Sequence, residues 1–125
     1  MLICAAKHPL ANAEAVRLDA LVNETFVDFP VGWGTRAVVD RAFATAGIDR
    51  QVSFEVADYT TAAGLVAIGL GVAFIPASAA LGLGGLARVP VEGAALNWRI
   101  LVATSATRRP SAAARAFLAE LLAHR

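Results

Sequence analysis

The stretch GLVAIGLGVAFIPASAALGLGGLA, from Gly64 to Ala87, contains no charged residue, and the charge-free run begins earlier, at Tyr59. Its length is compatible with a membrane-spanning helix, which needs about 20 mostly apolar residues. Six glycines and Pro76 argue against such a helix, because glycine costs about 1 kcal/mol relative to alanine and proline interrupts the backbone bonding. No aromatic belt or cluster of basic residues flanks the run. We therefore predict no membrane partner and interpret the stretch as the interior of a water-soluble α/β domain.

Within this run, the spacing predicts a helix over 60–68, with Asp58 or Thr60 capping its N-terminus. One of the two glycines at 69 and 71 is expected to end the helix in a left-handed conformation. Residues 72–75 then form a buried strand, since a strand covered on both faces is continuously apolar. One helical turn over 77–81 follows. The segment is thus helix, glycine turn, strand and turn.

The rest of the chain alternates strands and helices, which predicts an α/β fold with a largely parallel sheet and flanking helices. The other expected strands cover 2–6, 26–29, 52–56, 86–91 and 98–103, and the other helices cover 36–46, capped by Thr35 and closed by Gly47, and a final segment opened by Pro110 and Ser111. The chain has 125 residues, of which 58% are hydrophobic. Since about 45–50% is usual, some apolar surface is expected to meet another domain.

Charge and cysteine content exclude several classes of function. The net charge is +1, which gives no electrostatic basis for binding nucleic acid. The single cysteine, Cys4, excludes an internal disulfide and a cysteine-based zinc site. The N-terminal sequence lacks the basic region and long apolar core of a secretion signal, and we expect a cytoplasmic protein.

One loop has the position of a ligand site. It is PVGWGT, comprising Pro30, Val31, Gly32, Trp33, Gly34 and Thr35. The loop connects an expected strand to an expected helix, and open α/β sheets bind ligands at the carboxyl ends of their strands. Free amides at the helix start and the Thr35 hydroxyl can hold an anion, and Trp33 can cover an apolar part of a ligand. The alternative is a solvated loop in which Thr35 only caps the helix.

A second strand-to-helix passage contains Tyr59, Thr60 and Thr61. Because both passages follow neighbouring strands, we expect Thr35 and Thr60 at the same edge of the sheet. Catalytic patterns are poor by comparison. The two histidines stand at opposite ends of the chain, no serine lies in a nucleophile elbow, and no metal-ligand spacing occurs. We expect no catalytic residue, no metal, no cofactor and no enzymatic activity.

Several short motifs follow one another in a family-specific order. They are HPLA (8–11), RLDAL (17–21), FVDF (26–29), FATAG (43–47), GLVAIGLGVAFIP (64–76), LARVPV (86–91) and SAAARAFLAELL (111–122). In this order the chain resembles the C-terminal effector-binding region of LysR-type transcriptional regulators, over essentially its whole length.

This resemblance implies a fold like that of type 2 periplasmic binding proteins, in which a small-molecule cleft separates two α/β subdomains. Residues 1–125 would be a fragment of that region, with about 2–91 as the second subdomain and about 97–125 as a segment returning to an incomplete first subdomain. Ligand contacts are implied at 30–35 and 59–61. Other regulator subunits are implied as partners, and DNA would be bound only through a helix-turn-helix domain absent from this chain.

The leading interpretation is therefore a sensor that binds a small, anionic metabolite and reports it to a DNA-binding domain. Three alternatives stay open at this point: a solute-binding module of transport type, an enzyme on the same scaffold, and a truncated remnant without function.

Overall fold

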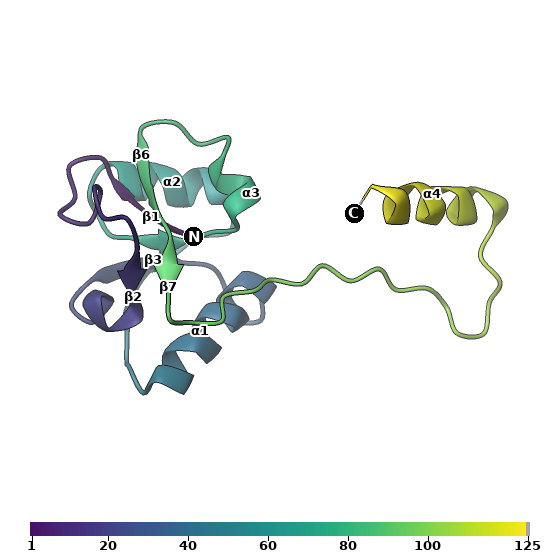
Figure 1. Cartoon of the computed structure of the whole chain (residues 1–125), viewed down its shortest axis with the longest axis horizontal. Helices are drawn as coiled ribbons and strands as arrows, with labels where there is room; N and C mark the ends of the chain where they lie inside the picture. The colour runs from purple at the N-terminus through teal and green to yellow at the C-terminus, as the bar shows by residue number, and fades with distance from the viewer. Residues whose placement is uncertain (125) are drawn as a thin grey trace.

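The charge-free segment folds into separate short elements rather than one continuous rod (Figure 1). The computed structural model describes residues 1–124. The segment contains α2 (Tyr59–Ala67), β5 (Ala73–Phe74) and α3 (Ala77–Ala80). Asp58 caps α2 by accepting the Thr61 N–H at 2.7 Å, and Gly69 follows the helix with a φ of 84°. The predicted order of helix, glycine turn, strand and turn is confirmed. Among residues 1–124, no helix is both long enough and apolar enough to cross a membrane.

The strands form a mixed sheet arrangement. Its members are β1 (Leu2–Ala5), β2 (Val16–Arg17), β3 (Thr25–Asp28), β4 (Gln51–Glu55), β6 (Leu86–Val89) and β7 (Val91–Glu92). The pairs β3·β4 and β2·β7 are parallel, whereas β1 runs antiparallel to both β5 and β6. Val72, which precedes β5, connects the sheet of β5, β1 and β6 to the pair β3·β4, because its N–H donates to the Thr25 carbonyl at 2.8 Å and its carbonyl accepts the Val27 N–H at 2.9 Å.

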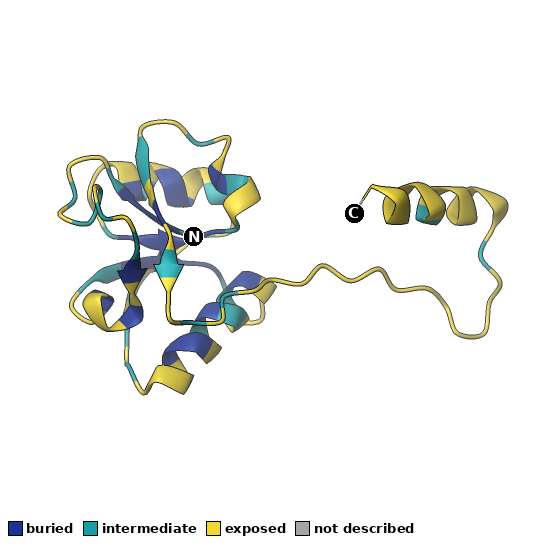
Figure 2. Ribbon diagram, viewed as in Figure 1, coloured by how far each residue is buried: buried dark blue, intermediate teal, exposed yellow. Residues whose placement is uncertain are grey.

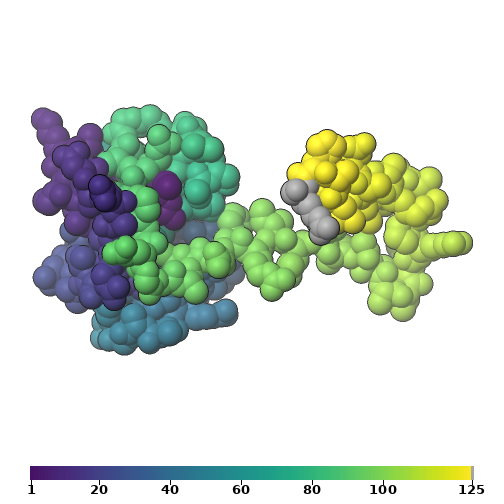
Figure 3. Space-filling model, in the orientation of Figure 1, coloured from purple at the N-terminus to yellow at the C-terminus, as the bar shows by residue number. Residues whose placement is uncertain are grey.

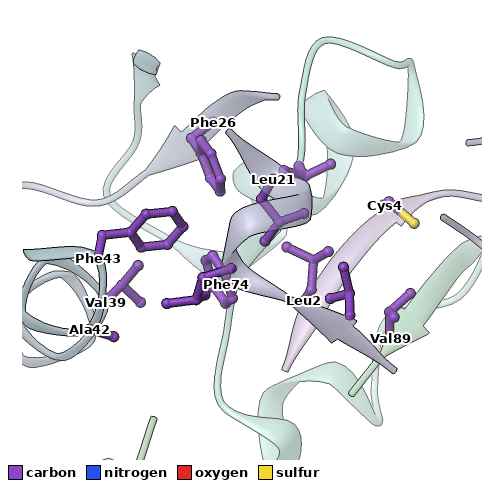
Figure 4. Packing of buried hydrophobic residues seen from close by; sticks show 12 residues of the cluster. Leu2, Cys4, Leu21, Phe26, Val39, Ala42, Phe43, Phe74 and Val89 are labelled. Atoms are coloured by element: carbon purple, nitrogen blue, oxygen red, sulfur yellow. The ribbon is translucent and has the colours of Figure 1, made fainter. Parts of the chain in front are cut away.

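Two hydrophobic clusters cover opposite faces of these strands. Neighbouring residues of a strand point to opposite faces, so Phe26 belongs to one cluster and Val27 to the other. Phe26 stacks on Phe74, with ring centroids 5.9 Å apart, and meets the edge of Phe43 at 5.6 Å (Figure 4). The second cluster packs against α2 through Val66 and neighbouring apolar side chains. This double coverage explains the continuous apolar runs in the sequence.

Helix α1 (Gly34–Ala46) starts two residues earlier than predicted and is capped differently. Trp33 is its N-cap and makes no side-chain capping bond, so the prediction that Thr35 caps this helix is wrong. Thr35 lies inside the first turn, and its hydroxyl is directed to another helix. Gly47 closes α1 with a φ of 67°, as predicted. A 3₁₀ turn, η1 (Leu18–Leu21), buries Leu18 and Leu21 in the first cluster.

The chain divides into a body, residues 1–96, and an arm, residues 97–124, which leaves the body beside α1 (Figures 1 and 3). The prediction of a strand over 98–103 is wrong, since these residues have no regular structure. A strand needs a partner for its backbone groups, and the described residues offer none here. The arm ends in α4 (Ala112–Ala123), which Ser111 caps and which has no buried residue (Figure 2).

Candidate functional site

The starts of α1 and α2 lie together. The Thr35 Oγ1 is 3.2 Å from the Tyr59 Oη, which is hydrogen-bonding distance. Phe29, which follows β3, meets the Tyr59 ring edge-on at 5.1 Å and stacks on Trp33 at 5.8 Å. The two strand-to-helix passages predicted to meet at one edge are therefore in contact, through Tyr59 rather than Thr60.

The first turn of α1 has the electrostatic properties of an anion site. Its first helical hydrogen bond runs from the Ala37 N–H to the Trp33 carbonyl at 2.9 Å. The amides of residues 34–36 precede that bond and have no carbonyl one turn earlier within the helix. Together with the helix dipole, such amides attract negative charge. Thr35 is only 8% exposed and adds a buried hydroxyl to this end of the helix.

A cavity of about 380 Å³ lies beside this first turn. Its walls come from α1, the end of β5 with the start of α3, the chain start and the root of the arm: Met1, Thr35, Val38, Val39, Phe74, Ile75, Pro76, Ala77, Ser78, Leu96, Asn97, Trp98 and Ile100. The lining is mostly apolar, with a few polar groups from Thr35, Ser78 and Asn97. Such a lining is typical of pockets for small organic molecules.

Of the nine predicted site residues, only Thr35 lines this cavity. Residues 30–33 form the turn that leads into α1, in which Val31 is 77% exposed, and Gly34 is the first residue of the helix. Thr60 and Thr61 lie in the first turn of α2 and are exposed. The Thr61 hydroxyl donates to Asp58 at 2.8 Å and so strengthens the α2 cap.

Sequence reasoning missed two walls of the cavity. Residues 76–78 form a third passage from a strand to a helix, β5 to α3, and the rule that selected the other two passages applies here as well. No sequence signal could reveal Leu96, Asn97 and Trp98, because they reach the cavity only through the path that the arm takes.

A second, larger cavity of about 590 Å³ lies beside the C-terminal half of α1. Its charged lining residues are balanced, with Arg17 and Arg41 against Asp19 and Glu92. Arg17 lies 3.6 Å from Asp19 and both side chains are more than half exposed. The larger cavity contains no residue from the first turn of α1 or α2. The smaller cavity, which Thr35 lines, is therefore the better candidate site.

A buried ionic network fixes α1 against the sheet and so sets the position of Thr35. Asp28 at the end of β3 pairs with Arg50, and both side chains are 5% exposed. Arg50 also donates to Asp40 at 2.6 Å, and Arg36 donates to the same carboxylate at 2.9 Å. The Arg36 Nη1 donates to the Phe29 carbonyl at 3.0 Å.

Within this network, burial alone would raise the pKa of Asp40, but the hydrogen bonds from Arg50 and Arg36 outweigh it and hold that pKa below its usual range. Asp40 therefore stays ionised near neutral pH, and α1 stays anchored.

The fold and this cavity define an α/β domain of the kind that binds small ligands. The model of the LysR substrate binding domain family matches residues 1–125, and the chain belongs to that family. The predicted family and fold class are confirmed.

Among curated proteins, the chain is similar to an uncharacterized HTH-type transcriptional regulator, YybE, of Bacillus subtilis (strain 168). The two are 41% identical over 69 residues, which cover 55% of this chain and 24% of that protein. A probable RuBisCO transcriptional regulator of Cyanophora paradoxa is 30% identical over 128 residues, covering 98% of this chain and 40% of that protein. The chain thus spans less than half the length of these two relatives.

Two solved structures extend the comparison. The regulatory domain of CcmR from Synechocystis PCC6803, in complex with 2-PG, has a TM-score of 0.89 and 25% identity, covering 98% of this chain and 61% of that one. The effector binding domain of BenM, with its effector benzoate, has a TM-score of 0.65 and 30% identity, covering 74% of this chain and 44% of that one.

Proposed function

We propose that this chain is the effector-sensing module of a cytoplasmic, non-enzymatic LysR-type transcriptional regulator, and that it binds a small carboxylate in the cavity beside the start of α1. The observation that carries the proposal is the placement of Thr35. Its buried hydroxyl lines the cavity on the first turn of a 13-residue helix, where free amides favour an anion.

The family match supports a regulator over a transport module, and it supports a ligand site over a remnant without function. The effector of BenM is benzoate, a carboxylate, and BenM is 30% identical to this chain. A small carboxylate also suits the cavity chemically, because its charge can approach the helix start at Thr35 while its carbon skeleton contacts Val38 and Ile75.

We further propose that residues 2–91 form the second subdomain and residues 97–125 return to a first subdomain. The uncovered arm supports this division, as does the 61% coverage of the CcmR regulatory domain. In a whole regulator, closure of the two subdomains around the ligand would be passed to other subunits and to a helix-turn-helix domain. A ligand shifts such an equilibrium only by its difference in affinity for the two arrangements.

The predicted residues 30–34 and 59–61 keep a supporting role in this proposal. Tyr59 lies within hydrogen-bonding distance of the Thr35 hydroxyl, Phe29 packs against the Tyr59 ring, and Trp33 stacks on Phe29. Thr60 and Thr61 are proposed to face a ligand only from the rim of the site.

The test is a thermal-shift titration with sodium benzoate, with benzyl alcohol as the uncharged control. At ten times the dissociation constant, binding should stabilise the chain by about 1.4 kcal/mol, which raises the melting temperature by several degrees. Thr35→Ala should abolish the rise, and Thr35→Ser, which keeps the hydroxyl, should retain most of it. An equal rise with benzyl alcohol, or an undiminished rise in Thr35→Ala, would contradict the proposed site.

A further inference from the structure

Trp98 makes an unusually close contact at the root of the arm. A Cβ placed on Gly34 would lie 2.8 Å from the Trp98 Nε1 and 3.6 Å from its Cδ1. The indole therefore rests on the first helical residue of α1, at a distance that any side chain would prevent. Gly34 has no positive φ, so its backbone does not require glycine. Glycine at this position leaves the space that Trp98 occupies.

The same indole is a wall of the cavity that Thr35 lines. Trp98 is 44% exposed, whereas the next arm side chains, Ile100 and Leu101, are 80% and 74% exposed. Trp98 is thus more deeply packed on the body than these side chains, although Ile100 also lines the cavity. Further along, the arm extends away from the body toward α4 (Figure 3).

Trp98 therefore belongs to the root of the arm, contacts the start of α1 and lines the cavity. We propose that Trp98, seated on Gly34, is a specificity and reporting residue, which selects ligands with a flat apolar face next to the carboxylate and ties the position of the arm to occupancy of the cavity. This inference rests on the proposed function, because the ligand it describes is the one proposed for that cavity.

The physical basis is simple. A flat ring gains contact area and favourable stacking against an indole, which acetate or another compact carboxylate lacks. A ligand that meets the indole only when it is seated on Gly34 stabilises the seated arrangement by that difference in affinity. Residues immediately after Trp98 are then held more closely to the body.

The first experiment needs no ligand. Trypsin cleaves after Arg99, next to Trp98, and after Arg108, further along the arm, and both arginines are exposed. The ratio of the two initial cleavage rates, followed by mass spectrometry, reports how firmly the arm root is held. Gly34→Ala should raise the Arg99-to-Arg108 ratio at least threefold, because the new methyl group displaces the indole.

The matched control is Gly64→Ala, since a Cβ at Gly64 meets nothing within 4 Å, and this variant should leave the ratio unchanged. Trp98→Ala should also raise the ratio, and Gly34→Ala should then add nothing in the Trp98→Ala background, because the two changes remove the same contact. The inference is overturned by an unchanged ratio in Trp98→Ala, or by a Gly34→Ala effect of the same size in both backgrounds. If Gly34→Ala does not fold, Trp98→Ala alone decides.

The second experiment compares sodium benzoate with sodium acetate. Benzoate should raise the melting temperature and lower the Arg99-to-Arg108 ratio at least twofold in the wild type, and Trp98→Ala should lose both the lowered ratio and the preference for benzoate over acetate. A melting temperature that rises while the cleavage ratio stays constant overturns this inference and leaves the proposed function standing. If benzoate does not raise the melting temperature, the result contradicts the proposed function. The cleavage ratios measured without ligand then still test whether Trp98 is held against Gly34.

Discussion

The body and the arm contain similar kinds of residue, yet they bury them very differently (Figure 2). In the body, Phe26 and Val66 are fully buried, because strands and helices cover them on all sides. In the arm, Phe117 is 64% exposed and Leu122 is 55% exposed. Both regions thus contain large apolar side chains, but only the body supplies the neighbouring elements that cover them. An apolar stripe specifies which face is buried and says nothing about what buries it.

The sharpest comparison of the two regions replaces one phenylalanine in each. Phe26→Ala should destabilise the body by about 4 kcal/mol, because Phe26 contacts both Phe43 and Phe74 and its loss leaves a cavity. Phe117→Ala should change the free energy of unfolding by less than about 0.5 kcal/mol. Urea denaturation of both variants measures the difference. Similar losses in the two variants would show that the arm is packed in solution.

The buried ionic network allows a second comparison. Arg50→Met should cost about 3 kcal/mol, because it removes the guanidinium that lies over the Phe26 ring and leaves the carboxylate of Asp28 buried without its principal partner. Arg99→Met, in the exposed arm, should be nearly neutral. Urea denaturation again gives the two values, and a neutral Arg50→Met would mean that the network does not anchor α1.

A smaller effect is expected within the charge-free segment. Gly64→Ala should stabilise the chain by about 1 kcal/mol, since Gly64 lies in the interior of α2 with open space around a new Cβ. Gly71→Ala should instead destabilise it, because the new Cβ would lie 2.5 Å from the Thr25 carbonyl oxygen. Melting temperatures that move in the same direction for both variants would contradict this description of the segment.

The smallest effect concerns acidity. The folded-state pKa of Asp40 is lowered, so its contribution to stability is present above the unfolded pKa of about 3.9 and is lost as the pH falls through the folded-state pKa. Asp40→Asn should therefore flatten the decline in melting temperature below about pH 4. Asp49→Asn, at an exposed position outside the network, is the control. If the melting temperature of Asp40→Asn declines below about pH 4 as steeply as that of the wild type, the ionised Asp40 carboxylate does not contribute to the network.

Much of the fold could be predicted because it depends on local chemistry. Asp58, Gly47 and Ser111 act at helix ends as their residue types suggest, and the glycines divide the charge-free segment where expected. Pairing between distant strands could not be predicted in the same way. The antiparallel pairs of β1 depend on how the chain returns to it, and the expected strand over 98–103 lacks a partner among the described residues.

The candidate site shows the same limit. Thr35 could be selected because it stands at a helix start after a strand, but its contact with Tyr59 in place of a capping bond depends on the packing of two helices. The strand-to-helix passage at Pro76–Ser78 could have been selected by the same rule, whereas the wall formed by Trp98 comes from an arm that only the folded chain brings beside α1.

The central claim is that a small carboxylate binds beside the first turn of α1, and backbone amide shifts measured by NMR during a benzoate titration test it most directly. We expect the largest shifts at Gly34, Thr35 and Arg36, with smaller ones at Ser78 and Trp98. Shifts confined to the larger cavity, around Arg17 and Arg41, or no saturable shifts at all, would contradict it.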